Sequence, residues 1–500
     1  MDAAGVGRAR DDVAVDEPSG VIFPPTASGT GLTSSLGRAV VAEALRAVDP
    51  VGAAAVRRET DWRRGYLVHF RRLVEAGLGA GAAARRIAVD GLSALHDRMR
   101  FRTAAGDVAP IDAAFAETDD RPLTTATVEG RGSVEKEFTL PYRGERLRGD
   151  AILRRLDAWR DAGVIEPSCA DAVHAVLANP DWLDLGGTTV VALGAGAEMG
   201  PVRSLLRWGN PVIAVDLARP ALWSRLIETA TGHGGRLHVP VPAGSGGDVA
   251  ARAGADLLHG IGAVARWLDG FEAPLVLGNY VYADGAVNVR LSTAVDALTQ
   301  RLRERRPETA LAFLATPTDV FAVPGDAVAH SARSYATPVG VARLRRPLRL
   351  LSAGRMLRRN YPPGDDPGIC DALVAQQGPN YALSKRVHRW RATVARSEGV
   401  TVSMNVAPPT RTRSVVKNRA LAAAYAGAHR FGVEVFEPAT SNTLMAALLV
   451  HDLHNPPAPA DHVWHEEADG AAHGGLWRMP YAPRSALGIA ALLGWGAAKT

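Results

Sequence analysis

Tyr381 and Lys385 stand four residues apart in the segment Asn-Tyr-Ala-Leu-Ser-Lys, and this pair could do acid–base chemistry. Residues four apart on a helix share a face, so Lys385 can lie along the same side as Tyr381. A phenol of reference pKa ~10 must drop by about three units to be substantially ionised near neutrality, which requires roughly 4 kcal/mol. A nearby ammonium and the positive charge of an oxidised nicotinamide both act in that direction. The pair therefore predicts a proton donor or acceptor for nicotinamide redox chemistry, although the same spacing is also common on ordinary surfaces.

A glycine-rich turn lies upstream, where Gly194, Gly196 and Gly200 follow an apolar run and precede a helix-like segment. The first two glycines permit a tight turn and close backbone approach, and Gly200 allows the helix to pack against the strand. The helix N-terminus then favours an anion such as a pyrophosphate. Asp216 ends the next predicted strand, 20 residues after Gly196, where a carboxylate can accept hydrogen bonds from a ribose diol. Because that carboxylate would repel a 2′-phosphate, NAD is favoured as the cofactor, and Arg219 nearby leaves NADP open.

The glycine turn by itself leaves three interpretations about equal. A strand, a turn and a helix with an acidic second strand also suit S-adenosylmethionine, or form a tight turn without a ligand. The residues downstream of the turn have to decide between a dinucleotide site and these alternatives.

The composition is that of a globular protein rather than a disordered or fibrous one. Of 500 residues, 47% are apolar and 22% are charged, and the net charge of +5 is not gathered in one long basic tract. Nucleic-acid binding is therefore not implied. Cys169 and Cys370 cannot build a disulfide framework, and the chain starts with no apolar signal sequence, so we expect a cytoplasmic protein. The apolar stretch 486–498 is too short to span a bilayer of roughly 30 Å.

The apolar pattern changes character near residue 185. Before it, apolar residues recur at helical spacing, interrupted by a loop or hairpin over 121–148. After it, short apolar runs alternate with helical segments, which is typical of a parallel sheet covered on both faces. The predicted strands cover 188–193, 211–216, 237–241, 274–278, 310–315 and 400–405.

The predicted fold class is α/β, with a doubly wound Rossmann-type sheet over roughly 188–455. We expect a disordered tail over 1–35, a mostly helical N-terminal module over 36–185, and an NAD(P)-binding catalytic domain over 186–500. This domain contains an insert over 324–378 between the fifth strand and the helix of Tyr381. The segment 341–359 of the insert is both basic and oily. A solvated helix with snorkelling arginines explains it, and so does a docking patch for an acidic, lipophilic partner, such as a membrane surface or an acyl carrier.

From the glycine turn to the last apolar helix, the chain resembles the short-chain dehydrogenase/reductase family. Gly196-Ala-Glu-Met-Gly200 is similar to that family's glycine turn, and Gly278-Asn279 to the start of its Asn-Asn-Ala-Gly motif. Asn288 opens a long helix where the family has its helix asparagine. Thr316, with Thr318 as a second candidate, falls where the family has its serine, and Tyr381 with Lys385 matches its Tyr-x-x-x-Lys.

A later segment extends the resemblance. Asn405-Val-Ala-Pro408-Pro409 is similar to the stretch that covers the nicotinamide in that family, although Pro409 replaces a glycine and Val202 another. Metal binding is not expected, because the histidines near the C-terminus lack a recognised ligand spacing.

The resemblance implies hydride transfer to or from a secondary alcohol or carbonyl group. Tyr381 would be the general acid or base, Lys385 would lower its pKa and hold the ribose, Thr316 would bind the substrate oxygen, and Asn288 would position a relay water. The cofactor-binding residues would be Gly194, Gly196, Gly200, Asp216, Gly278, Asn279, Lys385 and Pro408. The substrate is a small molecule, which the oily insert tilts towards a lipophilic or acyl type. A methyltransferase and a nucleotide-binding scaffold without turnover stay open as alternatives, as does assembly into a homo-oligomer.

Overall fold

The computed structural model describes residues 20–24, 33–79, 81–117, 122–337, 343 and 345–496. These residues form a central sheet of seven strands, in which six are parallel and the edge strand β4 runs antiparallel to β9. In spatial order the strands are β14 (Val402–Val406), β11 (Ala310–Ala315), β10 (Leu275–Asn279), β7 (Thr189–Leu193), β8 (Pro211–Val215), β9 (Arg236–Pro242) and β4 (Leu123–Glu129). The parallel strands thus follow the doubly wound order 3-2-1-4-5-6.

Each of the six predicted strands is present, with ends shifted by two residues or fewer. β7, β8, β10 and β11 are strands because their side chains are almost all apolar and are buried on both faces by helices. β14 also buries the polar Ser403 and Asn405, and β9 begins with the exposed Arg236. The predicted α/β class with a Rossmann-type sheet is consistent with this arrangement.

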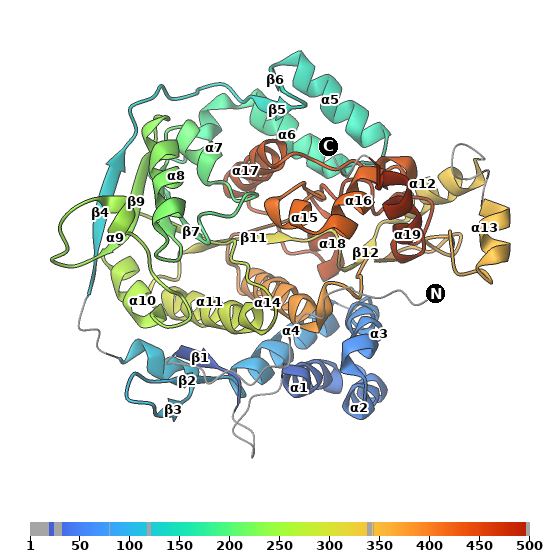
Figure 1. The fold of residues 1–500 in the computed structure, drawn as a ribbon, viewed down its shortest axis with the longest axis horizontal. Helices are drawn as coiled ribbons and strands as arrows, with labels where there is room; N and C mark the ends of the chain where they lie inside the picture. Colours follow the sequence, from blue (N-terminus) through green and yellow to red (C-terminus); the bar gives the residue numbers. More distant parts are fainter. Residues whose placement is uncertain are drawn as a thin grey trace.

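Helices cover both faces of the sheet (Figure 1). On one face lie α10 (Ile261–Asp269), α11 (Ala286–Arg305) and α14 (Gly378–Ser397), whose apolar side chains share one core with Val191, Leu277 and Leu311. On the other face, the core around Val190, Val276 and Ala312 includes residues of α7 (Val202–Arg207), α8 (Pro220–Thr231) and α17 (Pro438–His454). The alternation of these strand residues between two cores is the period-2 pattern of a strand.

The N-terminal helices form a further layer beneath α11 and α14 (Figure 1). They are α1 (Thr33–Arg46), α2 (Pro50–Arg58), α3 (Trp62–Ala76) and α4 (Gly81–His96). The expectation of a disordered tail does not hold for residues 20–24, because β1 (Gly20–Ile22) pairs with β2 (Arg100–Arg102) and Val21 is fully buried. Nor does it hold for residues 33–35, which form the start of α1. A third short strand, β3 (Val108–Ala109), pairs with β2 and leads into the 3-10 helix η1 (Ile111–Phe115). The remainder of the predicted tail, 1–19 and 25–32, lies outside the described residues.

A helical N-terminal module over 36–185 is not confirmed as a unit. The chain leaves the α1–α4 layer, adds β4 to the main sheet, and then crosses to the opposite face (Figure 1). There it forms the hairpin β5 (Leu140–Tyr142) and β6 (Glu145–Leu147), followed by α5 (Asp150–Asp161), α6 (Pro167–Ala178) and the 3-10 helix η2 (Pro180–Leu183). Apolar spacing revealed these helices but not the edge pairing of β4, whose alternate Thr side chains face solvent.

A pair of antiparallel strands joins the two ends of most of the insert. β12 (Val320–Val323) pairs with β13 (Gly368–Asp371), so the chain returns to the place where it left the sheet. Between them lie α12 (Gly325–Ala336) and α13 (Arg345–Leu351), and α13 projects from the body at the right of Figure 1.

The remaining helices complete the rim of the sheet and the C-terminal part. They are α9 (Val249–Arg252), α15 (Arg413–Lys417), α16 (Arg419–Gly427), η4 (Ala428–Phe431), α18 (Val463–Ala468) and α19 (Pro483–Gly494). Cys169 and Cys370 are both buried and free. Within the described ranges, no helix combines the length and the apolarity needed to cross a bilayer.

Candidate functional site

The predicted site residues gather at the carboxyl edge of the parallel strands. Gly194 follows β7, Asp216 follows β8, Asn279 ends β10, Thr316 follows β11 and Pro408 lies two residues after β14. Asn288 and Tyr381 occupy the first turns of α11 and α14, which start at this edge because each helix runs antiparallel to the strands. Ligands of doubly wound sheets bind at this edge, so the positions agree with a ligand site.

The glycine turn and Asp216 are joined directly. Gly194 has a φ of +80°, which only glycine adopts without strain, and its N–H donates to the Val215 carbonyl over 2.8 Å. The Gly196 N–H donates to Asp216 Oδ2 over 2.9 Å, and the Leu217 N–H donates to Oδ1 over 2.8 Å. Each carboxylate oxygen has two lone pairs, so Asp216 can still accept hydrogen bonds from a diol.

Two of the predicted glycines have a different physical role from the expected one. A Cβ on Gly200 would meet no atom closer than 3.4 Å, so helix packing does not require a glycine there. A Cβ on Gly278 would lie 2.5 Å from the ring of Tyr280, so this glycine makes room for an aromatic side chain. Tyr280 follows β10 and its ring also approaches Gly200, at 3.7 Å from the Cβ position. Sequence analysis missed Tyr280.

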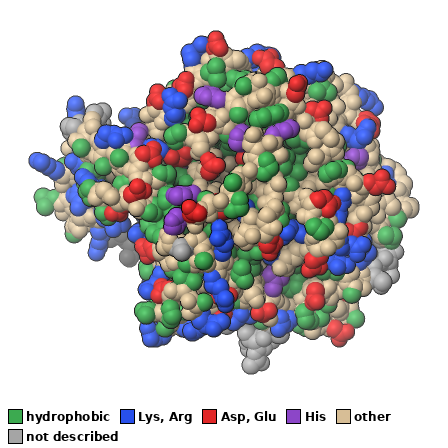
Figure 2. Space-filling model, turned by 180° about the vertical axis from the view of Figure 1, so that it is seen from behind, with side chains coloured by type: hydrophobic (Ala, Val, Ile, Leu, Met, Phe, Trp, Pro, Cys, Tyr) green, Lys and Arg blue, Asp and Glu red, His purple; other side chains and the backbone are tan. Residues whose placement is uncertain are grey.

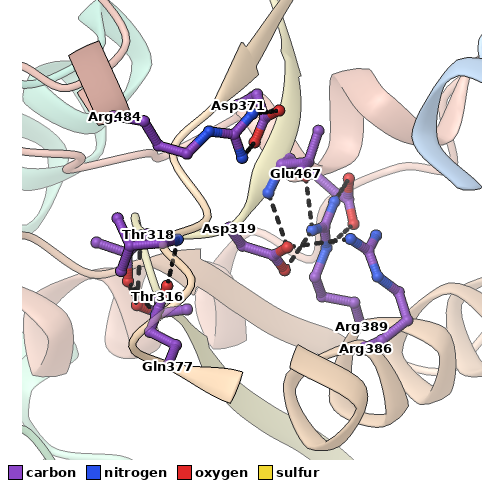
Figure 3. Close-up of polar contacts among 11 residues, drawn as sticks. Thr316, Thr318, Asp319, Asp371, Gln377, Arg386, Arg389, Glu467 and Arg484 are labelled. Atoms are coloured by element: carbon purple, nitrogen blue, oxygen red, sulfur yellow. Dashed lines mark hydrogen bonds and ion pairs between the residues drawn. The ribbon is translucent and has the colours of Figure 1, made fainter. Parts of the chain in front are cut away.

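A chain of hydroxyl groups leads to Tyr381. The Gln377 side-chain amide donates to Thr318 Oγ1 over 2.7 Å, and Thr318 Oγ1 lies 2.9 Å from Thr316 Oγ1 (Figure 3). Because the Gln377 amide donates to the Thr318 hydroxyl, the Thr318 hydroxyl can in turn donate to the Thr316 oxygen. The hydroxyl proton of Thr316 is then free to be donated to an acceptor in the site. Thr316 and Gln377 also lie close enough to the Tyr381 hydroxyl to lower its pKa as hydrogen-bond partners. Both candidate threonines therefore belong to the surroundings of Tyr381.

The two predicted catalytic groups on α14, Tyr381 and Lys385, have shifted pKa values. Burial raises the pKa of Tyr381, and the contacts from Thr316 and Gln377 only partly oppose it. Burial lowers the pKa of Lys385 to about 8. The Lys385 ammonium lies 5.9 Å from the centre of the Tyr381 ring. The predicted lowering of the phenol pKa by Lys385 is thus not found, because burial raises the pKa of Tyr381 and keeps its phenol protonated at pH 7.

Buried ion pairs hold α14 against the segment between β11 and β12, which carries Thr316. Asp319 follows Thr318 and accepts from Arg386 over 3.1 Å and from Arg389 over 2.7 Å, both on α14 (Figure 3). Arg389 also forms two contacts of 2.6 Å with Glu467 of α18. The side chains of Asp319, Arg386 and Arg389 are at most 5% exposed, so these ion pairs are shielded from water. This cluster explains how Tyr381 meets Thr316 although the insert separates them in the sequence.

The remaining predicted residues lie at the same edge with their own contacts. Asn288 is buried; its Oδ1 accepts from the Ala283 N–H over 3.1 Å, and its Nδ2 has no hydrogen-bond partner in the described structure. Asn279 Oδ1 accepts from the Val281 N–H. Pro408 is buried, and its carbonyl accepts from the Thr410 hydroxyl. The unpaired Nδ2 of Asn288 is a buried donor of the kind that binds a water or ligand oxygen.

Two tyrosines, Tyr282 and Tyr425, lie near Tyr381. The ring of Tyr282 packs edge-on against the ring of Tyr381, with 6.2 Å between the ring centres. Burial raises the pKa of Tyr425, and the charge of an ionised Tyr381 would raise that pKa further. Tyr425 lies on α16, which belongs to the segment after Pro408. A pair between Glu198 of the glycine turn and Arg413 of α15 ties this segment down, with 3.1 Å between Oε1 and Nε. Nothing in the local sequence pattern predicts Tyr282, Tyr425 or this pair.

A cavity lies away from this edge. Its volume is about 330 Å³, and Arg478, His330, Phe431 and Tyr481 contribute to its lining, which includes none of the predicted site residues. The segment of α15 and α16, which the pair of Glu198 with Arg413 ties to the glycine turn, is here called the cover of the sheet edge.

A scan of the chain against protein-family models found no match, and a search of the curated proteins found none either. Among solved structures, the chain is similar to one described as the structure of an A1-type ketoreductase, with a TM-score of 0.30 and 15% sequence identity. The match covers 62% of this chain and 54% of that chain, about half of its length. A similarity this low supports no inference about activity.

Proposed function

We propose that this protein is an NAD(P)-dependent oxidoreductase acting on a carbonyl group or a secondary alcohol. The observation that carries the proposal is the meeting of Thr316 and Tyr381 at the carboxyl edge of a doubly wound sheet, across the insert. A second hydroxyl beside a buried phenol is what a reaction needs when a carbonyl oxygen must be bound and protonated.

The residues present fit a dinucleotide. Gly194 makes the tight turn between β7 and α7, and Asp216 retains lone pairs for ribose hydroxyls. Asn288 has an unpaired buried donor for a relay water. The cofactor, when bound, supplies or takes the hydride. Lys385, with its lowered pKa, is still mostly charged at pH 7 and can donate to a ribose hydroxyl.

Tyr381 moves the proton at the substrate oxygen. Because burial keeps its phenol protonated, Tyr381 can donate a proton to the oxygen of a carbonyl substrate, and in the reverse reaction the same group takes the proton of the alcohol. Thr316 binds the same substrate oxygen. Its hydroxyl proton is available for this bond because Gln377 donates to Thr318 and Thr318 donates to Thr316. The aromatic surroundings formed by Tyr282 and Tyr425 favour a lipophilic substrate over a small polar one.

Replacing Tyr381 by Phe tests the proton donor. We expect turnover of a responsive ketone to fall about a hundredfold to ten-thousandfold, with cofactor affinity largely kept, because only the proton-transfer step loses its group. Tyr142→Phe is the matched control: it removes a phenol that donates to Glu434 over 2.7 Å, away from this edge. Turnover retained in Tyr381→Phe would mean that the proton donor is misassigned.

Calorimetry with NADH, NADPH and S-adenosylmethionine separates the alternatives. Binding of S-adenosylmethionine with neither dinucleotide would favour a methyltransferase and leave the contact between Thr316 and Tyr381 without a chemical role. Binding of a dinucleotide without turnover across a ketone panel would indicate a nucleotide-binding scaffold.

A further inference from the structure

The segment of residue 343 and residues 345–359, here called the arginine lobe, includes α13 and projects from the body of the protein (Figure 1). Its attachment is apolar and aromatic. Leu357 is fully buried and packs with Phe431 and Tyr481, and Leu348 is partly buried against the same cluster. Arg345 and Arg359 lie over the ring of Tyr335, at 4.0 and 4.6 Å from its centre. These contacts attach one side of the lobe to the body of the protein, and the opposite side, which makes none of them, is here called its free side.

The free side combines exposed leucines with exposed arginines. Leu350 and Leu351 are 84% and 86% exposed, and Met356 is 40% exposed. The arginines that are also exposed are Arg343, Arg346, Arg355 and Arg358. Positions 327–364 of the sequence contain eight arginines and neither Asp nor Glu. Figure 2 shows Lys or Arg and hydrophobic side chains side by side on the projecting lobe at its left edge.

Such a surface costs free energy in water unless something covers it. Leu350 and Leu351 leave most of their apolar surface in water, so they do not gain the free energy that burial of apolar surface provides. The arginines have no acidic neighbours within the segment, so the lobe carries a locally uncompensated positive charge. A partner must therefore offer negative charge and an apolar phase at the same time.

We propose that the arginine lobe docks on the surface of an anionic phospholipid bilayer. The arginines would bind lipid phosphates, and Leu350 and Leu351 would enter the boundary between head groups and acyl chains. A protein partner would need an acidic rim around an apolar pocket that takes two adjacent leucines, whereas an anionic bilayer presents negative head groups above an apolar phase over its whole surface. A bilayer needs only the insertion of a few side chains, and binding would be peripheral.

Vesicle co-sedimentation of the full-length protein tests the proposal. We expect binding to vesicles of phosphatidylcholine mixed with phosphatidylserine, weakening as salt rises, and no binding to phosphatidylcholine alone. The double variant Arg346→Gln with Arg355→Gln should lose affinity about fivefold per arginine. Leu350→Asp with Leu351→Asp should lose at least about tenfold, because a charge replaces each inserted side chain.

Two control variants lie on α3, in a different part of the molecule. Val68→Asp replaces an apolar side chain that is 67% exposed, and Arg64→Gln removes an arginine whose side chain is 88% exposed. Both should bind the anionic vesicles like the unaltered protein, and thermal unfolding by circular dichroism should be unchanged in all variants.

Equal binding to both kinds of vesicle, no binding at low salt, or unchanged binding of the lobe variants would overturn the proposal. A dimer in light scattering that the leucine variant dissolves would also overturn it, since a second copy would then cover the lobe. None of these readouts depends on enzymatic activity, so they are independent of the proposed redox function.

Discussion

Gly91 of α4 lies directly against the indole ring of Trp390 on α14. A Cβ on Gly91 would be 2.5 Å from the ring, and Trp390 is only 4% exposed, so the ring cannot easily move away. This close approach brings the N-terminal helices onto the helix that carries Tyr381 and Lys385. The first helices of the chain therefore support the candidate site from behind.

Gly91→Ala should destabilise the protein by about 1–3 kcal/mol, because overpacking outweighs the helix propensity that alanine gains. Gly488→Ala is the matched control, since a Cβ on this helical glycine meets no atom within 4 Å. We expect it to raise the free energy of unfolding slightly. Urea denaturation measures both, and a stabilised Gly91→Ala variant would contradict the close packing.

Asp319→Asn should cost about 3–5 kcal/mol, because it leaves Arg386 and Arg389 buried beside a neutral group. Turnover should fall as well, since the same pairs position Tyr381 beside Thr316. The control Asp61→Asn breaks an exposed pair with Arg64, at 3.6 Å, and should change stability by less than about 1 kcal/mol. Equal effects of the two substitutions in chemical denaturation would refute the positioning role.

Glu166 should make stability depend on pH in the acid range. Burial opposes its ionisation, but hydrogen bonds from His473 and Arg478 outweigh burial and lower its pKa to about 2. A lowered folded-state pKa contributes stability above the unfolded value of 4.5 that is lost as the pH falls towards 2. The contribution is about 3 kcal/mol at neutral pH. We expect Glu166→Gln to be less stable than the unaltered protein at pH 7 and to approach it below pH 3; a gap that persists in acid would exclude this linkage.

Arg413→Gln should loosen the cover over the site without unfolding the protein. The pair between Arg413 and Glu198 is partly exposed, so its loss should cost less than about 1 kcal/mol. Amide exchange over 413–427 should become several-fold faster, measured by mass spectrometry. Arg419→Gln, on the exposed side of α16, is the control and should leave exchange unchanged; equal acceleration in both would mean that the pair does not hold the cover.

Asp216→Asn tests the choice between NAD and NADP. Asparagine can still accept from the Gly196 N–H, but it removes the charge that repels a 2′-phosphate. The ratio of NADPH to NADH affinity, measured by fluorescence titration, should rise by about tenfold. An unchanged ratio would remove Asp216 from the ribose site.

The sequence by itself determined the parallel sheet and the glycine turn. The runs that became β7, β8, β10 and β11 are apolar on both faces, and only a sheet covered by helices buries both faces. The helix with Tyr381 and Lys385 was also predictable, because spacing along one helix is a local property. In addition, the resemblance to a known family placed Thr316 and Pro408 after their strands.

Only the tertiary structure decided what surrounds those residues. The pairing of β4 with β9, the ring of Tyr280 over Gly278, and the pair of Glu198 with Arg413 all join segments that no local pattern connects. The pKa of Tyr381 was predicted to be lowered by its neighbour Lys385, but burial raises it. Desolvation depends on everything packed around a group, so a spacing of four residues cannot reveal it.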